Sequence, residues 1–188
     1  IIATGSRPKT IPGFEIDEEK VLSSTGVLLS KSLPRRLLVL GAGAIGIELA
    51  YVMNAFGVEV TVVEMLPQIL PLEDGEVVEV LEKELVRRGM KIYTGTRALN
   101  LEKESKGLTV RLQKGEEPPF KVEADRVLVA VGRSPNTEGI GLERIGVNLE
   151  KGFIQVGDYY ETSVQGVYAV GDVVPTPLLA HVASKEGE

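Results

Sequence analysis

A glycine-rich segment at residues 41–46 carries the clearest chemistry in the sequence. It consists of Gly-Ala-Gly-Ala-Ile-Gly, follows the apolar run 37–40 directly, and its first glycine precedes Glu64 by 23 residues. This spacing is typical of a dinucleotide-binding turn between a strand and a helix. Gly41 permits a tight turn, Gly43 lets the backbone approach a pyrophosphate, and Gly46 allows the helix to pack close to the strand. A pyrophosphate bound there would lie at the helix N-terminus, where free N–H groups favour negative charge.

The residues after the glycines fit the helix and the second strand that such a turn requires. Apolar residues recur at the spacing of one helix face: Ile45, Leu49, Val52, Met53 and Phe56. We expect this helix to end at Gly57. The β-branched run 58–63 then predicts a strand that brings Glu64 to its carboxyl end, beside the glycine turn.

Glu64 indicates which dinucleotide is bound. A carboxylate at this point can accept both hydroxyls of an adenosine ribose, and it repels a 2′-phosphate. Residues 65–68 contain no arginine that could bind such a phosphate. The sequence therefore predicts NAD rather than NADP as the ligand. The alternative is a structural glycine turn beside a solvated glutamate.

Composition limits the other classes of function. The 188 residues, 43% of them hydrophobic, suffice for one large domain or for one domain with pieces of another. A net charge of −6 argues against nucleic acid as a partner. No apolar run approaches the ~20 residues of a membrane span, and the N-terminus has no signal-peptide pattern, so we expect a cytoplasmic protein. With no cysteine and the single histidine His181, we predict no metal site and no catalytic triad.

A short internal repeat predicts the domain organisation. Residues 3–8 and 130–135 share the pattern A-x-G-(S/R)-(R/S)-P, each copy follows a short apolar run, and the two begin 127 residues apart. We interpret both copies as the ends of equivalent strands, with an inserted domain between them.

Within the insert, the pattern favours an α/β fold. A helix is predicted at residues 73–88 from the spacing of Val77, Val80, Leu81 and Leu85, with Glu79/Lys83 and Glu84/Arg88 as ion pairs. Residues 90–94 predict a third parallel strand, and the alternating segments 108–112 and 120–123 predict an antiparallel excursion. The apolar run 126–131 then predicts a central strand whose carboxyl end faces the same crevice as the glycine turn.

Two further strands are predicted after the insert, at residues 153–156 and 167–170. The second leads into Gly171-Asp172. A carboxylate just past a buried strand can hold a sugar-like hydroxyl, or it can cap the next turn. The residues alone favour the cap slightly.

Several of these segments, taken in order, resemble the flavoprotein disulfide reductases (class I pyridine nucleotide-disulfide oxidoreductases). The segments are 3–8, the glycine turn with Glu64, 131–136, and 162–172, which reads T-S-V-Q-G-V-Y-A-V-G-D and is the most specific of them. Within that family, Gly46, Glu64 and the tail 178–187 are most similar to dihydrolipoamide dehydrogenases. The resemblance runs from end to end and implies that the chain is a middle fragment.

The resemblance implies an α/β fold in which a Rossmann-like parallel sheet with helices and an antiparallel β excursion is flanked by partial FAD-domain pieces. It implies residues 1–10 as the end of the first FAD part, 11–134 as the NAD-binding domain and 135–188 as a truncated second FAD part. The implied NAD residues are Gly41, Ala42, Gly43, Ala44, Ile45, Gly46, Ile47, Glu48, Glu64, Ala98 and Gly132. The implied FAD residues are Thr4, Gly5, Ser6, Asp172, Leu178, Leu179, Ala180 and His181. Glu48 is either an ancillary group near the nicotinamide or an acid that only compensates the helix dipole.

The resemblance also implies an activity and what the chain lacks for it. In the family, electrons pass from dihydrolipoamide to a cysteine pair, then to FAD, and then as hydride to NAD. The cysteine pair is expected upstream of Ile1 and the histidine base beyond Glu188, so the chain alone should be inactive. The parent is expected to be a homodimer within a 2-oxo acid dehydrogenase complex. Two alternatives stay open: a related flavoenzyme such as a mercuric reductase, NADH oxidase or transhydrogenase, and a non-catalytic NAD(H)-binding module.

Overall fold

The computed structural model describes residues 1–104 and 107–188, and these divide into two compact units. The larger unit is Pro8–Gly132, and the smaller combines Ile1–Arg7 with Arg133–Glu188. Both boundaries fall inside the two repeated A-x-G segments. The assignment of residues 1–10, 11–134 and 135–188 to cofactor domains stays a prediction.

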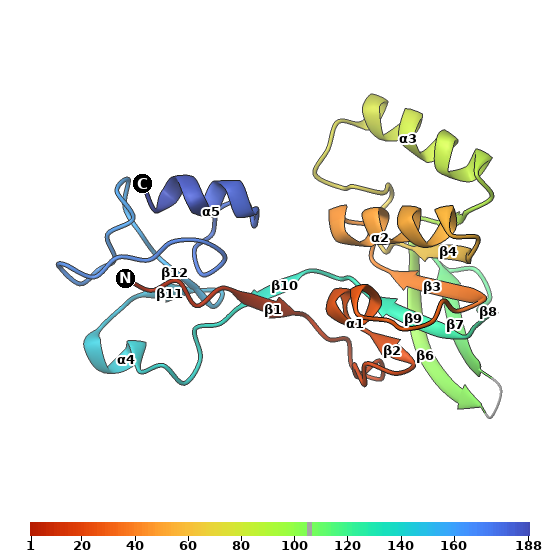
Figure 1. Ribbon diagram of the computed structural model, residues 1–188, viewed down its shortest axis with the longest axis horizontal. Helices are drawn as coiled ribbons and strands as arrows, with labels where there is room; N and C mark the ends of the chain where they lie inside the picture. The colour runs from red at the N-terminus through yellow and green to blue at the C-terminus, as the bar shows by residue number, and fades with distance from the viewer. Residues whose placement is uncertain (105–106) are drawn as a thin grey trace. The chain divides into compact units, whose positions relative to one another are not determined.

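A five-stranded parallel sheet forms the centre of the larger unit (Figure 1). Its strands in spatial order are β2 (Val21–Leu22), β9 (Arg126–Val129), β3 (Arg36–Leu40), β4 (Glu59–Val63) and β5 (Lys91–Tyr93). This confirms the predicted Rossmann-like sheet and the return of the chain to a central strand at β9. The edge strand β2 has only two residues, which is too short to leave an alternating pattern in the sequence.

Alternate residues of this sheet face two different apolar clusters. Leu37 and Val39 pack on the side of the helices α1 (Ser24–Leu28), α2 (Ala44–Ala55) and α3 (Gly75–Arg87). Leu38 and Leu40 pack on the opposite side, against an antiparallel sheet. That sheet consists of β6 (Thr96–Glu104), β7 (Gly107–Lys114) and β8 (Phe120–Ala124). The antiparallel excursion is confirmed, and it contains one strand, β6, that the sequence pattern did not predict.

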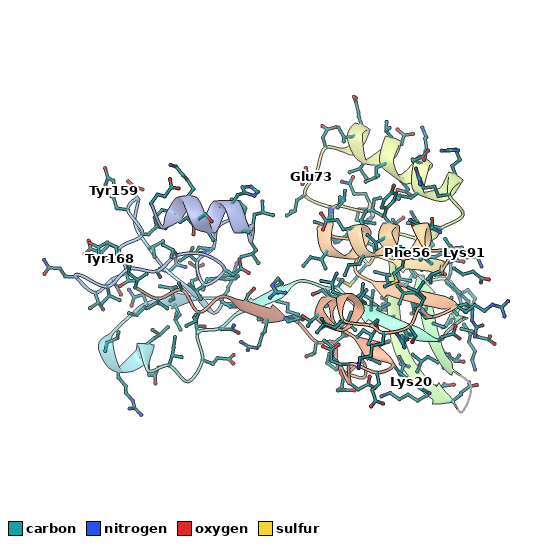
Figure 2. The ribbon with its side chains drawn as sticks, viewed as in Figure 1. Lys20, Phe56, Glu73, Lys91, Tyr159 and Tyr168 are labelled. Atoms are coloured by element: carbon teal, nitrogen blue, oxygen red, sulfur yellow. The ribbon has the colours of Figure 1, made fainter. Side chains whose placement is uncertain are left out.

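The buried face of α2 differs from the predicted one. Ile45 packs partly against the core and Leu49 and Met53 are buried, but Val52 and Phe56 are 41% and 69% exposed. Phe56 is labelled in Figure 2. The residues that the prediction missed on the buried face are Gly46, Ile47 and Ala50. Small side chains bring the helix close to the sheet, so the contact centres on them rather than on the largest apolar residues. Gly57 ends the helix with φ +84°, as predicted.

The packing of α3 also departs from the prediction. Val78 and Leu85 are buried and Leu81 is partly buried, whereas Val77 and Val80 are 67% and 70% exposed. Both predicted ion pairs are confirmed, at 2.6 Å for Glu79–Lys83 and 2.8 Å for Glu84–Arg88. The helix begins after Asp74, whose carboxylate accepts from the Glu76 N–H at 2.9 Å.

Charged side chains join the antiparallel sheet to the rest of the larger unit. Arg36, at the start of β3, pairs with Glu123 at 2.6 Å and with Asp125 at 3.2 Å. Burial raises the pKa of Asp125, but hydrogen bonds from the Arg36 backbone and guanidinium outweigh it and lower that pKa below its usual value. At the far end of β6, the Lys20 ammonium donates to the Glu104 carbonyl at 3.2 Å (Figure 2).

The smaller unit contains only short elements. Strands β1 (Ser6–Pro8) and β10 (Arg133–Pro135) pair with each other, β11 (Leu149–Glu150) pairs with β12 (Phe153–Ile154), and the helices are α4 (Leu142–Ile145) and α5 (Ala180–Glu186). The predicted strand at 167–170 is wrong. Ala169 bridges Ile2 and Tyr168 bridges Glu161, so neighbouring residues pair with different segments and no ladder extends. The predicted strand at 153–156 shortens to β12 for a similar reason, since Val156 bridges Thr162.

Within residues 1–104 and 107–188, no helix has both the length and the apolar character that a membrane crossing requires.

Two valines of α3 provide a matched test of this packing. Val78→Ala removes two methyl groups from a buried side chain and should lower the free energy of unfolding by about 1–3 kcal/mol. Val80→Ala makes the same change on an exposed side chain and should alter it by less than about 0.5 kcal/mol. Urea denaturation followed by circular dichroism measures both values. Equal losses would contradict the helix orientation.

Candidate functional site

The carboxyl ends of three adjacent strands meet in the larger unit. The glycine turn follows β3, Glu64 follows β4, and Ala130 follows β9. Backbone hydrogen bonds continue past the strand ends, because the Gly41 N–H donates to the Val63 carbonyl at 2.9 Å and the Ala130 N–H donates to the Leu40 carbonyl at 2.8 Å. The turn is therefore held on both sides, as expected for a site at the carboxyl edge of a parallel sheet.

Two glycines of this turn are required by close backbone contacts. Gly41 has φ +96°, and a Cβ there would lie 2.4 Å from the Ala130 carbonyl oxygen. A Cβ on Gly46 would lie 2.0 Å from the Gly41 carbonyl oxygen. Neither contact can be relieved by rotating a side chain, since both partners are backbone atoms. The turn therefore excludes even alanine at these two positions unless the backbone shifts.

Gly43 is different, because nothing crowds it. It is the N-cap of α2, its φ is −70°, and no atom lies within 4 Å of a Cβ built there. No side chain caps this helix end, and no acidic residue occupies its first turn. The first turn of a helix leaves N–H groups without intrahelical partners, so this end offers open donors and a positive dipole to an anion.

The Glu64 carboxylate is bound to backbone on both sides. One oxygen, Oε2, accepts from the Ala42 N–H at 2.7 Å, and the other, Oε1, accepts from the Leu66 N–H at 2.9 Å. The side chain is nearly buried, at 9% exposure. Charge-assisted hydrogen bonds of this kind are among the stronger ones in proteins. Glu64 thus ties the glycine turn to the loop that follows β4, a structural role that the sequence did not predict.

The remaining predicted NAD residues take several positions. Ala42 is fully buried, Ile47 is buried, Ile45 is partly buried and Ala44 is exposed in the first turn of α2. Gly132 ends the larger unit with φ +111°, and its carbonyl accepts from the Lys9 N–H at 3.0 Å.

Glu48 and Ala98 need separate comment. Glu48 is exposed and lies beyond the first turn of α2, and both interpretations of it stay predictions. Ala98 lies in β6, where it packs against the apolar cluster between the two sheets.

The smaller unit holds a hollow of about 350 Å³. It is lined by Ala3, Gly5, Val170, Gly171, Asp172, Ala183 and Ser184. Two of the predicted FAD residues, Gly5 and Asp172, are therefore brought together although 167 positions separate them in the chain. The Asp172 carboxylate accepts from the Ser6 hydroxyl at 2.5 Å instead of capping the next turn, which contradicts the slight preference for a cap.

The other predicted FAD residues lie around this hollow or at the start of α5. Thr4 donates from its hydroxyl to the Asn136 carbonyl at 2.6 Å. Leu179 is the N-cap of α5. Leu178 is half-buried, whereas Leu179, Ala180 and His181 are exposed.

Two charged residues, Arg133 and Glu186, received no role from the sequence although they bind residues in or next to the lining of the hollow. Arg133 donates to Ser6, and Glu186 accepts from the Gly171 N–H at 2.6 Å. Glu186 is nearly buried, and its other oxygen, Oε1, has no hydrogen-bond partner among the described residues. The signal for Arg133 was present in the repeat, where the order Ser-Arg in the first copy becomes Arg-Ser in the second.

Among the described residues, no group of three or more histidine, cysteine, aspartate or glutamate side chains could hold a metal ion.

Known sequences give the chain a family context. The profile of the family described as pyridine nucleotide-disulphide oxidoreductase matches residues 1–187. The dihydrolipoyl dehydrogenase of Thermus scotoductus is 47% identical over all of this chain and 41% of the relative. The mitochondrial dihydrolipoyl dehydrogenase of Pisum sativum is 45% identical over 38% of its length, and the leghemoglobin reductase of Glycine max is 44% identical over 36%. The chain thus spans about two fifths of these relatives.

Solved structures agree with this context. LpdA from Mycobacterium tuberculosis superposes with a TM-score of 0.90 at 34% identity, over 98% of this chain and 40% of that one. The HOCl-induced flavoprotein disulfide reductase RclA from Escherichia coli gives a TM-score of 0.87 at 27% identity, over 97% of this chain and 41% of that one. The fold class and the resemblance to flavoprotein disulfide reductases are confirmed.

The different surroundings of Gly41 and Gly43 predict unequal effects of the same substitution. Gly41→Ala places a Cβ at positive φ against the Ala130 carbonyl and should lower the free energy of unfolding by about 2–4 kcal/mol. Gly43→Ala meets no neighbouring atom and should cost under about 1 kcal/mol. Thermal unfolding of the two variants measures the difference. A Gly43→Ala variant as unstable as Gly41→Ala would show that the turn geometry is wrong.

Proposed function

The chain belongs to the pyridine nucleotide-disulphide oxidoreductase family, and we propose that its larger unit is the NAD-binding portion of a dihydrolipoyl dehydrogenase-like flavoenzyme. The whole enzyme would oxidise protein-bound dihydrolipoamide and pass hydride from flavin to NAD. One observation carries the proposal: an uncapped helix N-terminus lies beside a carboxylate at the end of the next strand, and the turn before the helix has no room for side chains at Gly41 and Gly46.

The first turn of α2 is proposed to bind the pyrophosphate. Gly43 leaves the approach open, and neither a capping side chain nor an acid competes there. Backbone N–H groups and the helix dipole together favour the negative charge of a phosphate. Because Gly41 and Gly46 are fixed by backbone contacts, these donors are already in place before the ligand arrives.

Glu64 is proposed to bind the adenosine ribose while it holds the turn. Each carboxylate oxygen has about two acceptor positions, and each already uses one for a backbone N–H. One position therefore remains on each oxygen for the two ribose hydroxyls. A 2′-phosphate at the same place would meet a negative charge that is nearly buried, which favours NAD over NADP.

The smaller unit is proposed to carry part of the FAD site. Its hollow presents Gly5 and Asp172, a backbone without side-chain bulk and a carboxylate able to accept from a sugar-alcohol hydroxyl. FAD, when bound, supplies the hydride chemistry, and the residues of this chain hold and orient it.

The scope of the proposed activity follows from composition and from the relatives. The chain contains no cysteine, so it cannot supply a redox-active thiol pair, and we propose that it is inactive with dihydrolipoamide by itself. A homodimeric parent within a 2-oxo acid dehydrogenase complex is proposed from the dihydrolipoyl dehydrogenase relatives. The cytoplasmic location stays a prediction, since one relative is described as mitochondrial.

Binding of the two reduced nucleotides tests the NAD assignment. We expect NADH to bind the chain at least several-fold more tightly than NADPH, because Glu64 repels the 2′-phosphate. Glu64→Gln removes the charge and should bring the dissociation constants of NADH and NADPH closer together. Its amide NH₂ also replaces one acceptor oxygen, so one of the two hydrogen bonds from the backbone N–H groups is lost. Nucleotide fluorescence titration gives both constants. Equal affinity of the unsubstituted chain for NADH and NADPH would contradict the assignment.

A further inference from the structure

The two repeated segments, 3–8 and 130–135, bind each other through one arginine from each, Arg7 and Arg133. The Arg7 guanidinium donates to the Pro135 carbonyl at 3.0 Å and to Asn136 Oδ1 at 3.2 Å. The Arg133 guanidinium donates to the Ser6 carbonyl at 2.7 Å and to the Ser6 hydroxyl oxygen at 2.6 Å. Each arginine thus binds the other segment, but only the contact made by Arg133 includes a side-chain hydroxyl.

The direction of the Ser6 hydroxyl proton follows from these contacts. Arginine has donors and no acceptor, so Ser6 Oγ must accept from Arg133 Nε. The hydroxyl proton then remains for the other neighbour of Ser6 Oγ, which is Asp172 Oδ2 at 2.5 Å. Arg133, Ser6 and Asp172 therefore form a directed chain of hydrogen bonds.

Direct attraction between Arg133 and Asp172 is the smaller part of this arrangement. Their nearest charged atoms, Nε and Oδ2, are 3.7 Å apart, and the side chains are 25% and 26% exposed. At 3.7 Å the two atoms are too far apart for a direct hydrogen bond. The Ser6 hydroxyl, which lies within hydrogen-bond distance of both groups, makes the close contacts.

The arrangement leaves one side of the Asp172 carboxylate available. Oδ2 is occupied by Ser6, while no described residue donates to Oδ1, and Asp172 lines the hollow of about 350 Å³. The preceding residue, Gly171, is fixed from the other direction by the Glu186 carboxylate at 2.6 Å. Asp172 is thus held at one oxygen and next to a bound backbone N–H, with the second oxygen free for a hydroxyl.

We propose that Arg133 is a positioning residue which, through Ser6, orients the Asp172 carboxylate to accept a sugar-alcohol hydroxyl of FAD. The inference rests on the proposed function and deepens it. Arg133 itself does not contact the ligand in this arrangement. Its effect is to prevent the Ser6 hydroxyl from turning away, so that Asp172 keeps a single orientation when the ligand arrives.

Flavin affinity of the full-length protein that contains this chain tests the proposal. Ser6→Ala and Arg133→Met should each raise the dissociation constant of FAD about tenfold, and Asp172→Asn should raise it at least as much. The double variant Ser6→Ala/Arg133→Met should bind FAD no more weakly than the weaker-binding single variant. Both changes interrupt the same chain of hydrogen bonds, so their effects do not add. Ser6→Thr keeps the hydroxyl and should bind FAD as tightly as the unsubstituted protein. Equilibrium dialysis with FAD gives each constant.

Arg7→Met is the matched control, since it removes the other of these two arginines without touching Ser6 or Asp172. It should leave FAD affinity unchanged. The thermal unfolding temperature without FAD, measured for every variant, separates lost structure from lost positioning. Retained FAD affinity in Ser6→Ala and Arg133→Met, while Asp172→Asn loses it, would overturn the positioning role alone. An unsubstituted protein that binds no FAD would overturn the proposed function as well.

Discussion

The Glu64 carboxylate accepts hydrogen bonds from the Ala42 and Leu66 backbone, and the arrangement of the larger unit around the glycine turn depends on this pair of contacts. They join the turn after β3 to the loop after β4. That loop is also tied back to the turn, because the Leu70 N–H donates to the Ala42 carbonyl at 2.8 Å. Ala42 therefore has both of its backbone groups bound, which leaves the turn little freedom. A ligand would meet donors whose positions are already fixed.

On its other side, the glycine turn is restricted by steric contact with the backbone that follows β9. Ala130 follows the central strand β9, and its carbonyl oxygen lies 2.4 Å from the place that a Cβ on Gly41 would take. The order β9-β3-β4 in the sheet therefore determines both constraints, because it places Ala130 on one side of the turn and Glu64 on the other. In the smaller unit a carboxylate is positioned without the five-stranded sheet of the larger unit. There, side chains of the two repeated segments bind each other, and the Asp172 carboxylate is oriented through Ser6.

Much of the larger unit could be predicted from the sequence, because its signals are local. The glycine turn, the strands on both sides of it and the ends of α2 and α3 each follow from residues within one turn or strand. The buried helix faces could not be predicted in the same way. Gly46 and Ala50 determine how closely α2 approaches the sheet, and a count of large apolar residues overlooks them. Strand β6 was missed because its register shifts between Ala98 and Asn100, so Leu99 is 39% exposed and the apolar residues do not alternate regularly. The contacts of Glu64, Arg133 and Glu186 depend on residues far away in the sequence, so no spacing rule finds them.

A ¹⁵N–¹H NMR titration of the chain with NADH tests most directly whether the turn held by Glu64 is the nucleotide site. We predict that the largest shifts fall on the backbone amides of residues 41–46 and on Glu64 and Leu66. The Ala42 amide proton should stay protected from exchange with solvent throughout, since it is bound to the Glu64 carboxylate before NADH is added. Shifts confined to the smaller unit, with the amides of residues 41–46 unchanged at saturating NADH, would contradict this assignment.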